Sequence, residues 1–355
     1  MRKIKFYEAI KESQTQLMMR DKSIVTMGLG INDPKGIFGT TKDLNKIFGN
    51  KRVLETPTSE NAITGIAVGA AIEGLRPIIT HQRVEFSLLS MEQIINQAAK
   101  WYFLSGGKYK VPIVIRLIIG KGWGQGPQHS QSLEALFSHI PGLKVVSPSN
   151  AYDAKGLLAS SIKDNHPVIF FEHRWLHNIE TKVPKKLFTV PIGKAKILQK
   201  GKDLTIISFS EALVQVLRIR QILEKSNISA EIIDLRSLRP FDKKTILKSV
   251  KKTKKVLVVD NSWKSFGISS EIISFISENI LNSLTKKPKR LGIKELPLPS
   301  SRSLAKECYL NTNEILDAIA SLSGKKINRK VIKEFLLKNK DLKTDIPYKD
   351  FKGPF

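Results

Sequence analysis

The sequence is poor in cysteine, in aromatic residues and in long apolar runs. Its 355 residues include one cysteine, Cys308, which excludes an internal disulfide and fits a reducing cytoplasm. No stretch approaches the roughly eighteen uninterrupted apolar residues that a membrane-spanning helix needs. The N-terminal segment 1–14 is charged and lacks the apolar centre of a signal peptide. We therefore expect a soluble cytoplasmic protein without a membrane partner.

Acidic residues are also scarce, with 32 Asp and Glu against 59 Lys and Arg and a formal net charge of +27. Clustered cations of this kind can bind nucleic acid by releasing counterions from phosphates. Here the lysines spread along the chain, and no aromatic residues alternate with them as stacking platforms. We therefore expect no nucleic-acid partner and interpret the charge as a lysine-rich solvated surface. Docking to an acidic partner is the alternative.

Several common catalytic motifs are missing too. The chain has no G-x-S-x-G nucleophile elbow, no P-loop and no G-x-G-x-x-G fingerprint in the right context. The glycine-rich stretch 120–130 lacks the Gly-Lys-Ser/Thr ending of a phosphate loop. His173 and His177 have i, i+4 spacing but flank a strand exit, where that spacing does not place them on one face. The histidines therefore form no metal signature.

Helix-like and strand-like segments alternate along the chain. Helices are expected at 5–20, 61–74, 87–104 and 153–164, and strands at 24–30, 76–80, 111–119, 143–149 and 167–172. Such alternation predicts an α/β domain with a parallel sheet covered on both faces. The pattern restarts with strands at 204–210, 230–235 and 255–260 and helices at 211–225, 242–252 and 269–283. We predict a first domain at 1–180, a linker at 181–195, a smaller α/β domain at 196–325 and a basic extension at 326–355.

Several of these segments resemble one family. Residues 55–78 look like the segment that holds the catalytic glutamate in beta subunits of the decarboxylase component of 2-oxoacid dehydrogenases. Residues 129–158 are similar to the stretch with that family's active-site histidine, and 232–242 and 256–272 resemble its C-terminal domain. The resemblance covers roughly residues 4 to 320. It implies a thiamine-diphosphate pyrimidine-binding domain followed by a transketolase C-terminal-type domain.

The resemblance implies the catalytic residues. It places the family's glutamate at Glu60, where a carboxyl group bound to the cofactor's pyrimidine nitrogen favours the reactive tautomer. From the sequence alone, Glu60 is also explained as a first-turn carboxylate of a helix. Phe86 falls where the family stacks a ring on the aminopyrimidine, although it could be an ordinary core residue. His129 falls where the family's histidine faces substrate, although it could be a loop histidine satisfied by backbone.

The resemblance also implies cofactor contacts from Gly28, Leu29 and Gln82. Beta subunits of this family usually carry one or two acidic residues just after the first strand, where this chain has Gly28, Leu29 and Gly30. The sequence therefore departs from the family in the lining of the expected cofactor pocket.

A second departure lies at Thr80, His81 and Arg83, where family members often have an acid and apolar residues. We predict that this changed lining serves a substrate other than pyruvate, with His81 or Arg83 facing an anionic or sugar-like molecule. The alternative is that either residue pairs with Glu85.

Two further predictions concern packing and ions. The family buries the helix at 61–74 in its subunit interface, so we expect Gly65 and Gly69 there. The turn at 164–167 resembles a loop that binds a structural potassium ion in some members. That similarity predicts a backbone site near Ile162, Asp164 and Asn165, with a plain helix-to-strand turn as the alternative.

A final absence points to a partner. The chain has no Gly-Asp-Gly run to hold magnesium against the diphosphate. The resemblance therefore implies a separate alpha subunit that carries this motif, in a heterotetramer of two alpha and two beta chains. The expected function is the beta subunit of a 2-oxoacid dehydrogenase, with a lipoyl acyltransferase as a candidate further partner. The alternatives are half of a split transketolase-like or acyloin-forming enzyme of sugar or surface-polysaccharide metabolism, and a non-catalytic paralogue.

Overall fold

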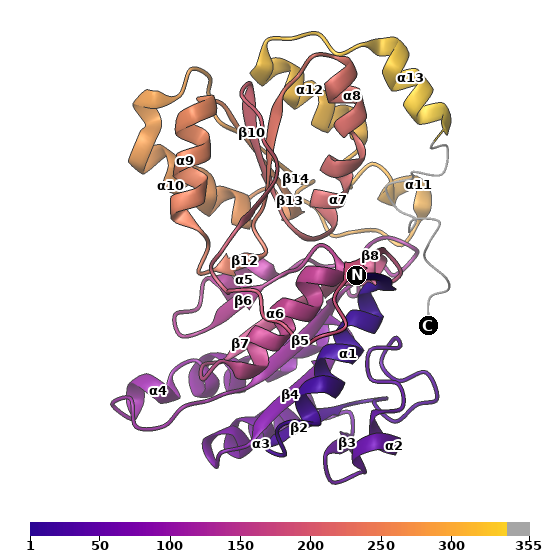
Figure 1. The fold of residues 1–355 in the computed structure, drawn as a ribbon, viewed down its shortest axis with the longest axis vertical. Coiled ribbons are helices and arrows are strands. Elements are labelled where there is room, and N and C mark those ends of the chain that lie inside the picture. The colour runs from indigo at the N-terminus through magenta and orange to yellow at the C-terminus, as the bar shows by residue number, and fades with distance from the viewer. Residues whose placement is uncertain (339–355) are drawn as a thin grey trace.

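Two parallel-type sheets, one of seven strands and one of five, form the centres of two stacked domains in the computed structural model (Figure 1). The structure describes residues 1–338. Helices cover both faces of each sheet, and the N-terminal domain carries the larger sheet. The predicted α/β class and the order of the two domains are confirmed.

The seven-stranded sheet has the order β12-β6-β7-β5-β4-β2-β3. Its strands are β2 (Ile24–Gly28), β3 (Val53–Glu55), β4 (Arg76–His81), β5 (Val114–Ile119), β6 (Lys144–Val146), β7 (Val168–His173) and β12 (Ser237–Arg239). Every residue of β5 and β7 is buried, as expected for apolar runs at the centre of a parallel sheet. β12 is antiparallel to β6 and comes from the C-terminal half of the chain. The two domains therefore share a sheet edge.

The two faces of β5 belong to two different hydrophobic cores. Ile115 and Leu117 face the core that includes α3 (Glu60–Ile72), while Val114 and Ile118 face the core of α1 and α6. The other elements of this domain are β1 (Arg2–Lys5), α1 (Phe6–Met18), α2 (Leu44–Phe48), η1 (Val84–Ser90), η2 (Gln93–Ala98), α4 (Trp101–Leu104), α5 (Glu134–Ser138), α6 (Ala151–Lys163), η3 (Arg174–Leu176) and β8 (Glu180–Val183).

The expected single helix at 87–104 is wrong. The segment forms the 3₁₀ helix η1, the π-helical turn η2 and the short helix α4. Its apolar residues divide between a buried side with Ile94 and an exposed side with Leu89 and Phe103. Because they do not form one continuous buried stripe, nothing forces the segment into one straight helix.

The second sheet has the order β14-β13-β10-β11-β9, with only β9 antiparallel to its neighbour. Its elements are β9 (Lys196–Gln199), β10 (Leu204–Ser208), α7 (Ser210–Arg218), α8 (Arg220–Lys225), β11 (Ala230–Asp234), α9 (Lys243–Thr253), β13 (Val256–Trp263), α10 (Ile268–Ile280), η4 (Leu281–Ser283), β14 (Lys289–Ile293), α11 (Arg302–Ala305), α12 (Thr312–Ser323) and α13 (Arg329–Lys338). Val331 and Phe335 of α13 pack against the core of this domain. The rest of the predicted basic extension, 339–355, lies outside the described residues. None of the described helices is long and apolar enough to cross a membrane.

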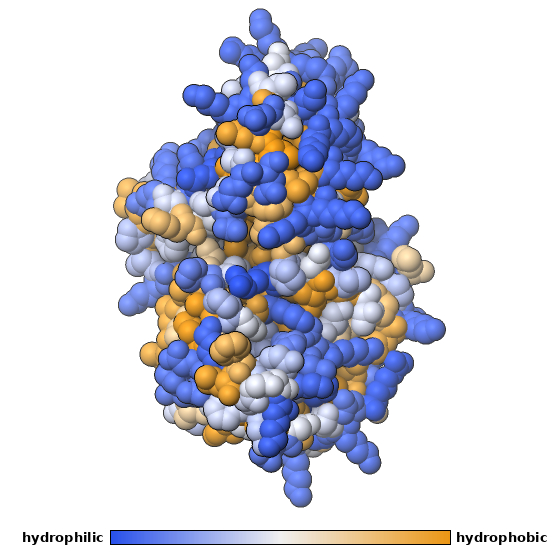
Figure 2. Space-filling model, turned by 90° about the vertical axis from the view of Figure 1, so that its left-hand side faces the viewer, coloured by the Kyte–Doolittle hydropathy of each residue, from blue (hydrophilic) through white to orange (hydrophobic). Residues whose placement is uncertain are grey.

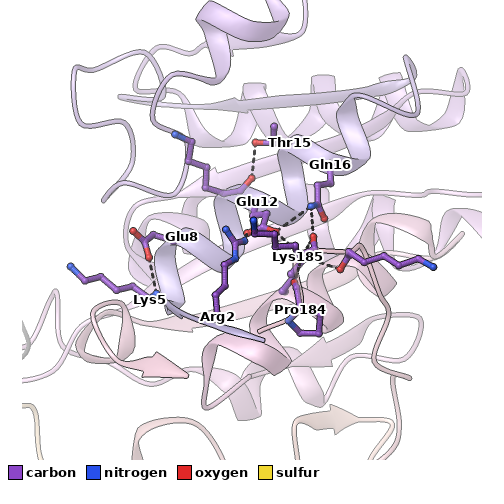
Figure 3. Close-up of polar contacts among 11 residues, drawn as sticks. Arg2, Lys5, Glu8, Glu12, Thr15, Gln16, Pro184 and Lys185 are labelled. Atoms are coloured by element: carbon purple, nitrogen blue, oxygen red, sulfur yellow. Dashed lines mark hydrogen bonds and ion pairs between the residues drawn. The ribbon is translucent and has the colours of Figure 1, made fainter. Parts of the chain in front are cut away.

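The segment between the domains is fixed to the first domain. Strand β8 pairs with β1, and the buried ammonium of Lys155 donates to the carbonyls of residues 184–186 at 2.9 to 3.1 Å. Lys155 also donates to Glu12 at 2.8 Å. Figure 3 shows Glu12, on α1, facing Pro184 and Lys185. The predicted linker therefore runs along the first domain, held there by strand pairing and by the hydrogen bonds of Lys155.

Candidate active site

The candidate site lies at the carboxyl edge of the first sheet. Strands β2, β3, β4, β5 and β7 are parallel, so the loops that follow them meet at this edge. In the order β4-β2-β3, the strand that follows β2 along the chain, β3, lies on one side of β2, and the next strand, β4, lies on its other side. Ligands of α/β sheets commonly bind at such a reversal, outside the carboxyl ends of the strands.

Three of the predicted cofactor residues meet at this reversal. Nε2 of Gln82, after β4, donates to the carbonyl of Leu29, after β2, at 2.6 Å. A Cβ atom at Gly28 would lie 2.8 Å from the carbonyl oxygen of Thr80. Only glycine therefore allows the ends of β2 and β4 to approach this closely.

An acidic group does reach this loop, but from another strand. The carboxylate of Glu55, at the end of β3, accepts from the backbone N–H groups of Gly30 at 2.5 Å and Asn32 at 2.9 Å. The loop after β2 therefore lies against a carboxylate from the neighbouring strand end, although it has no acidic residue of its own at positions 28–30. Local sequence patterns could not predict this contact, because 25 residues separate Glu55 from Gly30.

Glu60 is the first residue of α3 and is partly buried. The preceding Ser59 makes no side-chain cap, so the carboxylate of Glu60 is the acidic group at the helix start. Helix α3 begins just after β3 and packs against β4 and η1, the element that carries Phe86. The helix start and the carboxyl edge therefore coincide, and the two explanations of Glu60 are compatible.

Phe86 and His129 lie together. Their rings meet edge to face, with centroids 5.7 Å apart and an interplanar angle of 83°. Nδ1 of His129 is buried and has no hydrogen-bond partner within residues 1–338. The structure thus joins two residues that sequence resemblance selected 43 positions apart.

A cavity of about 1150 Å³ opens beside this pair. Of the predicted residues, Gln82, Arg83, Phe86 and His129 line it, together with Arg174, which sequence analysis missed. Glu60, Gly28, Leu29 and His81 are not among its lining residues in the described part of the chain. Arg174 directly follows the end of β7, so the strand-end rule could have identified it.

The structure places His81, a predicted substrate contact, outside the cavity lining of residues 1–338. The side chain is 3% exposed, and its Nε2 lies 3.4 Å from the hydroxyl of Thr64 on α3. Burial lowers the pKa of His81 to about 4, so the imidazole is neutral near pH 7. His81 points into the packing between β4 and α3, because the last residue of a strand can face either side of the sheet.

Arg83 does face the cavity, although it is only 8% exposed. Burial lowers its pKa, and the charge of Glu85 opposes that shift. Glu85 itself accepts from the backbone N–H of Gln131 at 2.8 Å, and burial raises its pKa. The alternative pairing is therefore an electrostatic attraction, with no hydrogen bond from Arg83 to Glu85.

The second domain holds one wall of the cavity in place. Nζ of Lys121, in the glycine-rich loop after β5, lies 2.9 Å from the carboxylate of Glu211 on α7. The hydroxyl of Tyr309 accepts from the backbone N–H of Gly122 at 2.7 Å. Trp123 and Gln125 of the same loop line the cavity. Sequence analysis missed these contacts because they join residues on different domains.

The two predicted interface glycines differ. A Cβ atom at Gly65 would lie 3.1 Å from Oε1 of Gln93 within the chain, whereas Gly69 is exposed with open space beside it. Exposed apolar side chains share this part of the molecule, namely Ile66, Leu88, Leu89, Phe103 and Leu104. On the face that carries α4, Figure 2 shows apolar patches over the first domain. Such a surface is typical of a protein–protein interface.

The predicted potassium loop is occupied by protein cations. Arg76 donates to the carbonyls of Ile162 and Asp164, both at 3.0 Å, and to Oδ1 of Asn165 at 2.9 Å. Nζ of Lys144 lies 2.5 Å from the Asp164 carboxylate. A potassium ion at these oxygens would face both cations, so the arrangement disfavours it.

Comparison with known proteins agrees with this geometry. The family model of the transketolase pyrimidine binding domain matches residues 2–178, and that of the transketolase C-terminal domain matches residues 193–315. The chain is 39% identical over 322 residues to the pyruvate dehydrogenase E1 component subunit beta of Porphyra purpurea, covering 91% of this chain and 97% of that one. The protein of that name from Rickettsia felis is 37% identical, covering 88% of this chain and 96% of its own.

Solved structures share the fold at lower identity. A structure described as a split gene transketolase, inactive beta4 tetramer, has a TM-score of 0.74 and 20% identity, covering 90% of this chain and 99% of its own. The transketolase of Campylobacter jejuni subsp. jejuni NCTC 11168 has a TM-score of 0.67 and 15% identity, covering 90% of this chain and 47% of its own. The chain thus belongs to the beta subunits of the thiamine-diphosphate-dependent decarboxylase component of 2-oxoacid dehydrogenases, within the transketolase-like superfamily.

Proposed function

We propose that this chain provides the pyrimidine-binding half of a thiamine-diphosphate-dependent 2-oxoacid dehydrogenase and acts with a separate alpha subunit. The observation that carries the proposal is the convergence at one sheet edge of Glu60, the Gln82–Leu29 contact and the Phe86–His129 pair. Relatives of 37% to 39% identity over most of the chain support the same assignment.

The residues present fit this cofactor. Oε1 of Gln125 and Nδ1 of His129 are buried cavity atoms without partners among residues 1–338, so they can bind a small molecule. When bound, thiamine diphosphate supplies a nucleophilic carbon and an electron sink for cleavage beside a carbonyl group.

Each side chain then has a defined task. Glu60 would hold the pyrimidine nitrogen through its carboxyl group, and Phe86 would offer a ring face to the pyrimidine. Gln82 would line the same pocket, and the backbone at Gly28 and Leu29, outside the cavity lining, would hold Gln82 toward the cofactor. His129 would orient the substrate and move a proton at Nδ1, which suits an imidazole near neutral pH.

The diphosphate and its magnesium ion require the partner. Residues 1–338 contain no cluster of three or more His, Cys, Asp or Glu side chains that could hold a metal. We propose that the alpha subunit supplies this half of the site in a heterotetramer of two alpha and two beta chains. The exposed apolar surface around Gly69 and Ile66 is the proposed contact, with Gly65 packed behind it. The proposed compartment is the cytoplasm, in keeping with the free thiol of Cys308.

Calorimetric titration of thiamine diphosphate and magnesium tests the proposal. Tight binding is expected only when the chain is co-expressed with its alpha subunit. Glu60→Gln in this pair should lower cofactor-dependent turnover by at least about 100-fold, as for loss of a general acid–base group.

Glu73→Gln is the matched control, because Glu73 is exposed at the other end of the same helix. It should leave turnover unchanged. Equal effects of the two substitutions would refute the role of Glu60. Failure of the assembled pair to bind the cofactor would favour a non-catalytic paralogue.

A further inference from the structure

The cavity beside Phe86 and His129 carries more positive charge than a small 2-oxoacid needs. We propose that it binds a second anionic group of the substrate, a carboxylate or a phosphate remote from the reacting carbonyl. This inference rests on the proposed function, since it assigns a substrate class to the same site.

Charge is the first argument. The cavity is lined by five cationic side chains, Lys5, Lys35, Lys42, Arg83 and Arg174. Asp33 is the one carboxylate among its described lining residues. A cleft lined by one sign of charge concentrates ligands of the opposite sign.

The two arginines form the buried part of this lining. Arg83 is 8% exposed and Arg174 is 6% exposed. Cζ of Arg174 lies 4.4 Å and Cζ of Arg83 lies 6.0 Å from the ring centroid of Phe38. Burial lowers the pKa of Arg174 to about 10, and the like charge of Arg83 contributes, so Arg174 stays protonated near pH 7. Two buried cations beside one ring repel each other, and an anion bound near both would relieve that repulsion.

Neighbouring carboxylates leave the charge of Arg83 only partly compensated. Nη1 of Arg83 is buried and has no hydrogen-bond partner among residues 1–338. Glu85 attracts Arg83 but is held by the backbone of Gln131. A guanidinium with an unused buried N–H is suited to a carboxylate or phosphate oxygen.

The size of the cavity agrees. Its volume of about 1150 Å³ exceeds the roughly 300–1000 Å³ of pockets that hold drug-sized ligands. The cofactor and the substrate would share this space beside Phe86 and His129. A longer substrate with a distal anionic group can contact that pair at one end and Arg83 at the other.

Matched substrates test the inference in the assembled enzyme with its alpha subunit, cofactor and magnesium. The pair 2-oxoglutarate and 2-oxopentanoate differs in the distal carboxylate, and 3-phosphohydroxypyruvate and hydroxypyruvate differ in the phosphate. One charged member should exceed its neutral partner in kcat/KM at least tenfold, as for one charge-assisted hydrogen bond. Which pair does so identifies the anion as carboxylate or phosphate.

Arg83→Met and Arg174→Met should each abolish this preference, and Arg83→Lys should retain part of it. Arg20→Met is the control, since Arg20 is exposed and outside the cavity lining. Turnover without preference for either charged member, or an unchanged preference in Arg83→Met, would overturn the inference and leave the proposed function intact.

Binding without turnover separates the two proposals. Calorimetry of the same assembly with glutarate, inorganic phosphate and pentanoate should show binding of one dianion that Arg83→Met weakens at least tenfold. If this binding is present but no 2-oxo compound is turned over, the anion site stands and the proposed function fails. If neither dianion binds more tightly than pentanoate, the anion site is refuted.

Discussion

The ion pair of Arg116 and Glu172 gives the sharpest stability prediction. Both side chains are fully buried, and they meet at two points, Nε to Oε1 at 2.5 Å and Nη2 to Oε2 at 3.0 Å. Arg116 also donates to the hydroxyls of Thr40 at 2.8 Å and Thr80 at 3.2 Å. The pair therefore ties β5, β7 and β4 to the loop that carries Phe38, beneath the cavity.

Arg116→Met should lower the free energy of unfolding by about 3–5 kcal/mol, because it leaves the Glu172 carboxylate buried without its cation. At about 2–4 °C per kcal/mol, the thermal midpoint should fall by roughly 6–20 °C. The double variant Arg116→Met with Glu172→Leu removes both charges and should lose less than the single variant. Arg20→Met, at an exposed site, should stay near the native value.

The pH dependence gives a second, sign-sensitive test. Burial raises the pKa of Glu172, but Arg116 and His177 outweigh it and lower the pKa to about 2. In the native protein this stabilisation is complete above pH 4.5 and is lost only as pH falls toward 2. In Arg116→Met, burial dominates and the pKa lies above its unfolded value. Stability of that variant should therefore rise as pH falls from 7 to 5.5.

Thermal midpoints by circular dichroism at pH 7 and 5.5 provide the measurement for the native chain, for Arg116→Met, Glu172→Leu and their double variant, and for Arg20→Met. The reasoning is refuted if Arg116→Met melts with Arg20→Met, or if its midpoint does not rise relative to the native chain at the lower pH. A double variant that loses the sum of the two single effects would refute the ion-pair argument.

Two further predictions concern loops. Tyr309→Phe removes one hydrogen bond to Gly122, worth about 1 kcal/mol, and should speed deuterium exchange in 120–126. Tyr109→Phe is the exposed control, and equal exchange in both variants would contradict the cross-domain restraint. Because Arg76 occupies the predicted potassium loop, the native thermal midpoint should be the same in potassium and sodium chloride. A thermal midpoint more than about 3 °C higher in potassium than in sodium chloride, near 1 kcal/mol of stability, would contradict this and support the predicted potassium site.

The α/β fold could be predicted from the sequence because local patterns of apolar residues indicate its helices and strands. The β-branched run at 111–119 is central strand β5, and the helix expected at 61–74 is α3, with bounds shifted by a residue or two. The family assignment is confirmed, since long collinear segments carried it. The domain boundaries and the roles of Glu60, Phe86 and His129 stay predictions.

The site features that the sequence did not predict depend on which way a side chain points and on contacts between residues far apart in the chain. His81 and Arg83 are two residues apart, yet one packs against α3 and the other faces the cavity, because the strand ends between them. Arg174 and Lys121 join the site through contacts across strands and domains, at sequence separations that no local pattern spans. Similarly, Arg116 lies within an apolar run, and no local sequence pattern predicts that it pairs with Glu172.

Strand β12 bears on how the chain can be divided. The segment Ser237–Arg239 lies beyond the first family match, yet it pairs with β6 and closes that edge of the first sheet. A fragment that stops at the linker would leave β6 paired only with β7 and expose its outer edge, and exposed strand edges promote aggregation. Expression fragments should therefore keep the chain intact through residue 239, and a hinge opening between the domains would have to break this shared edge first.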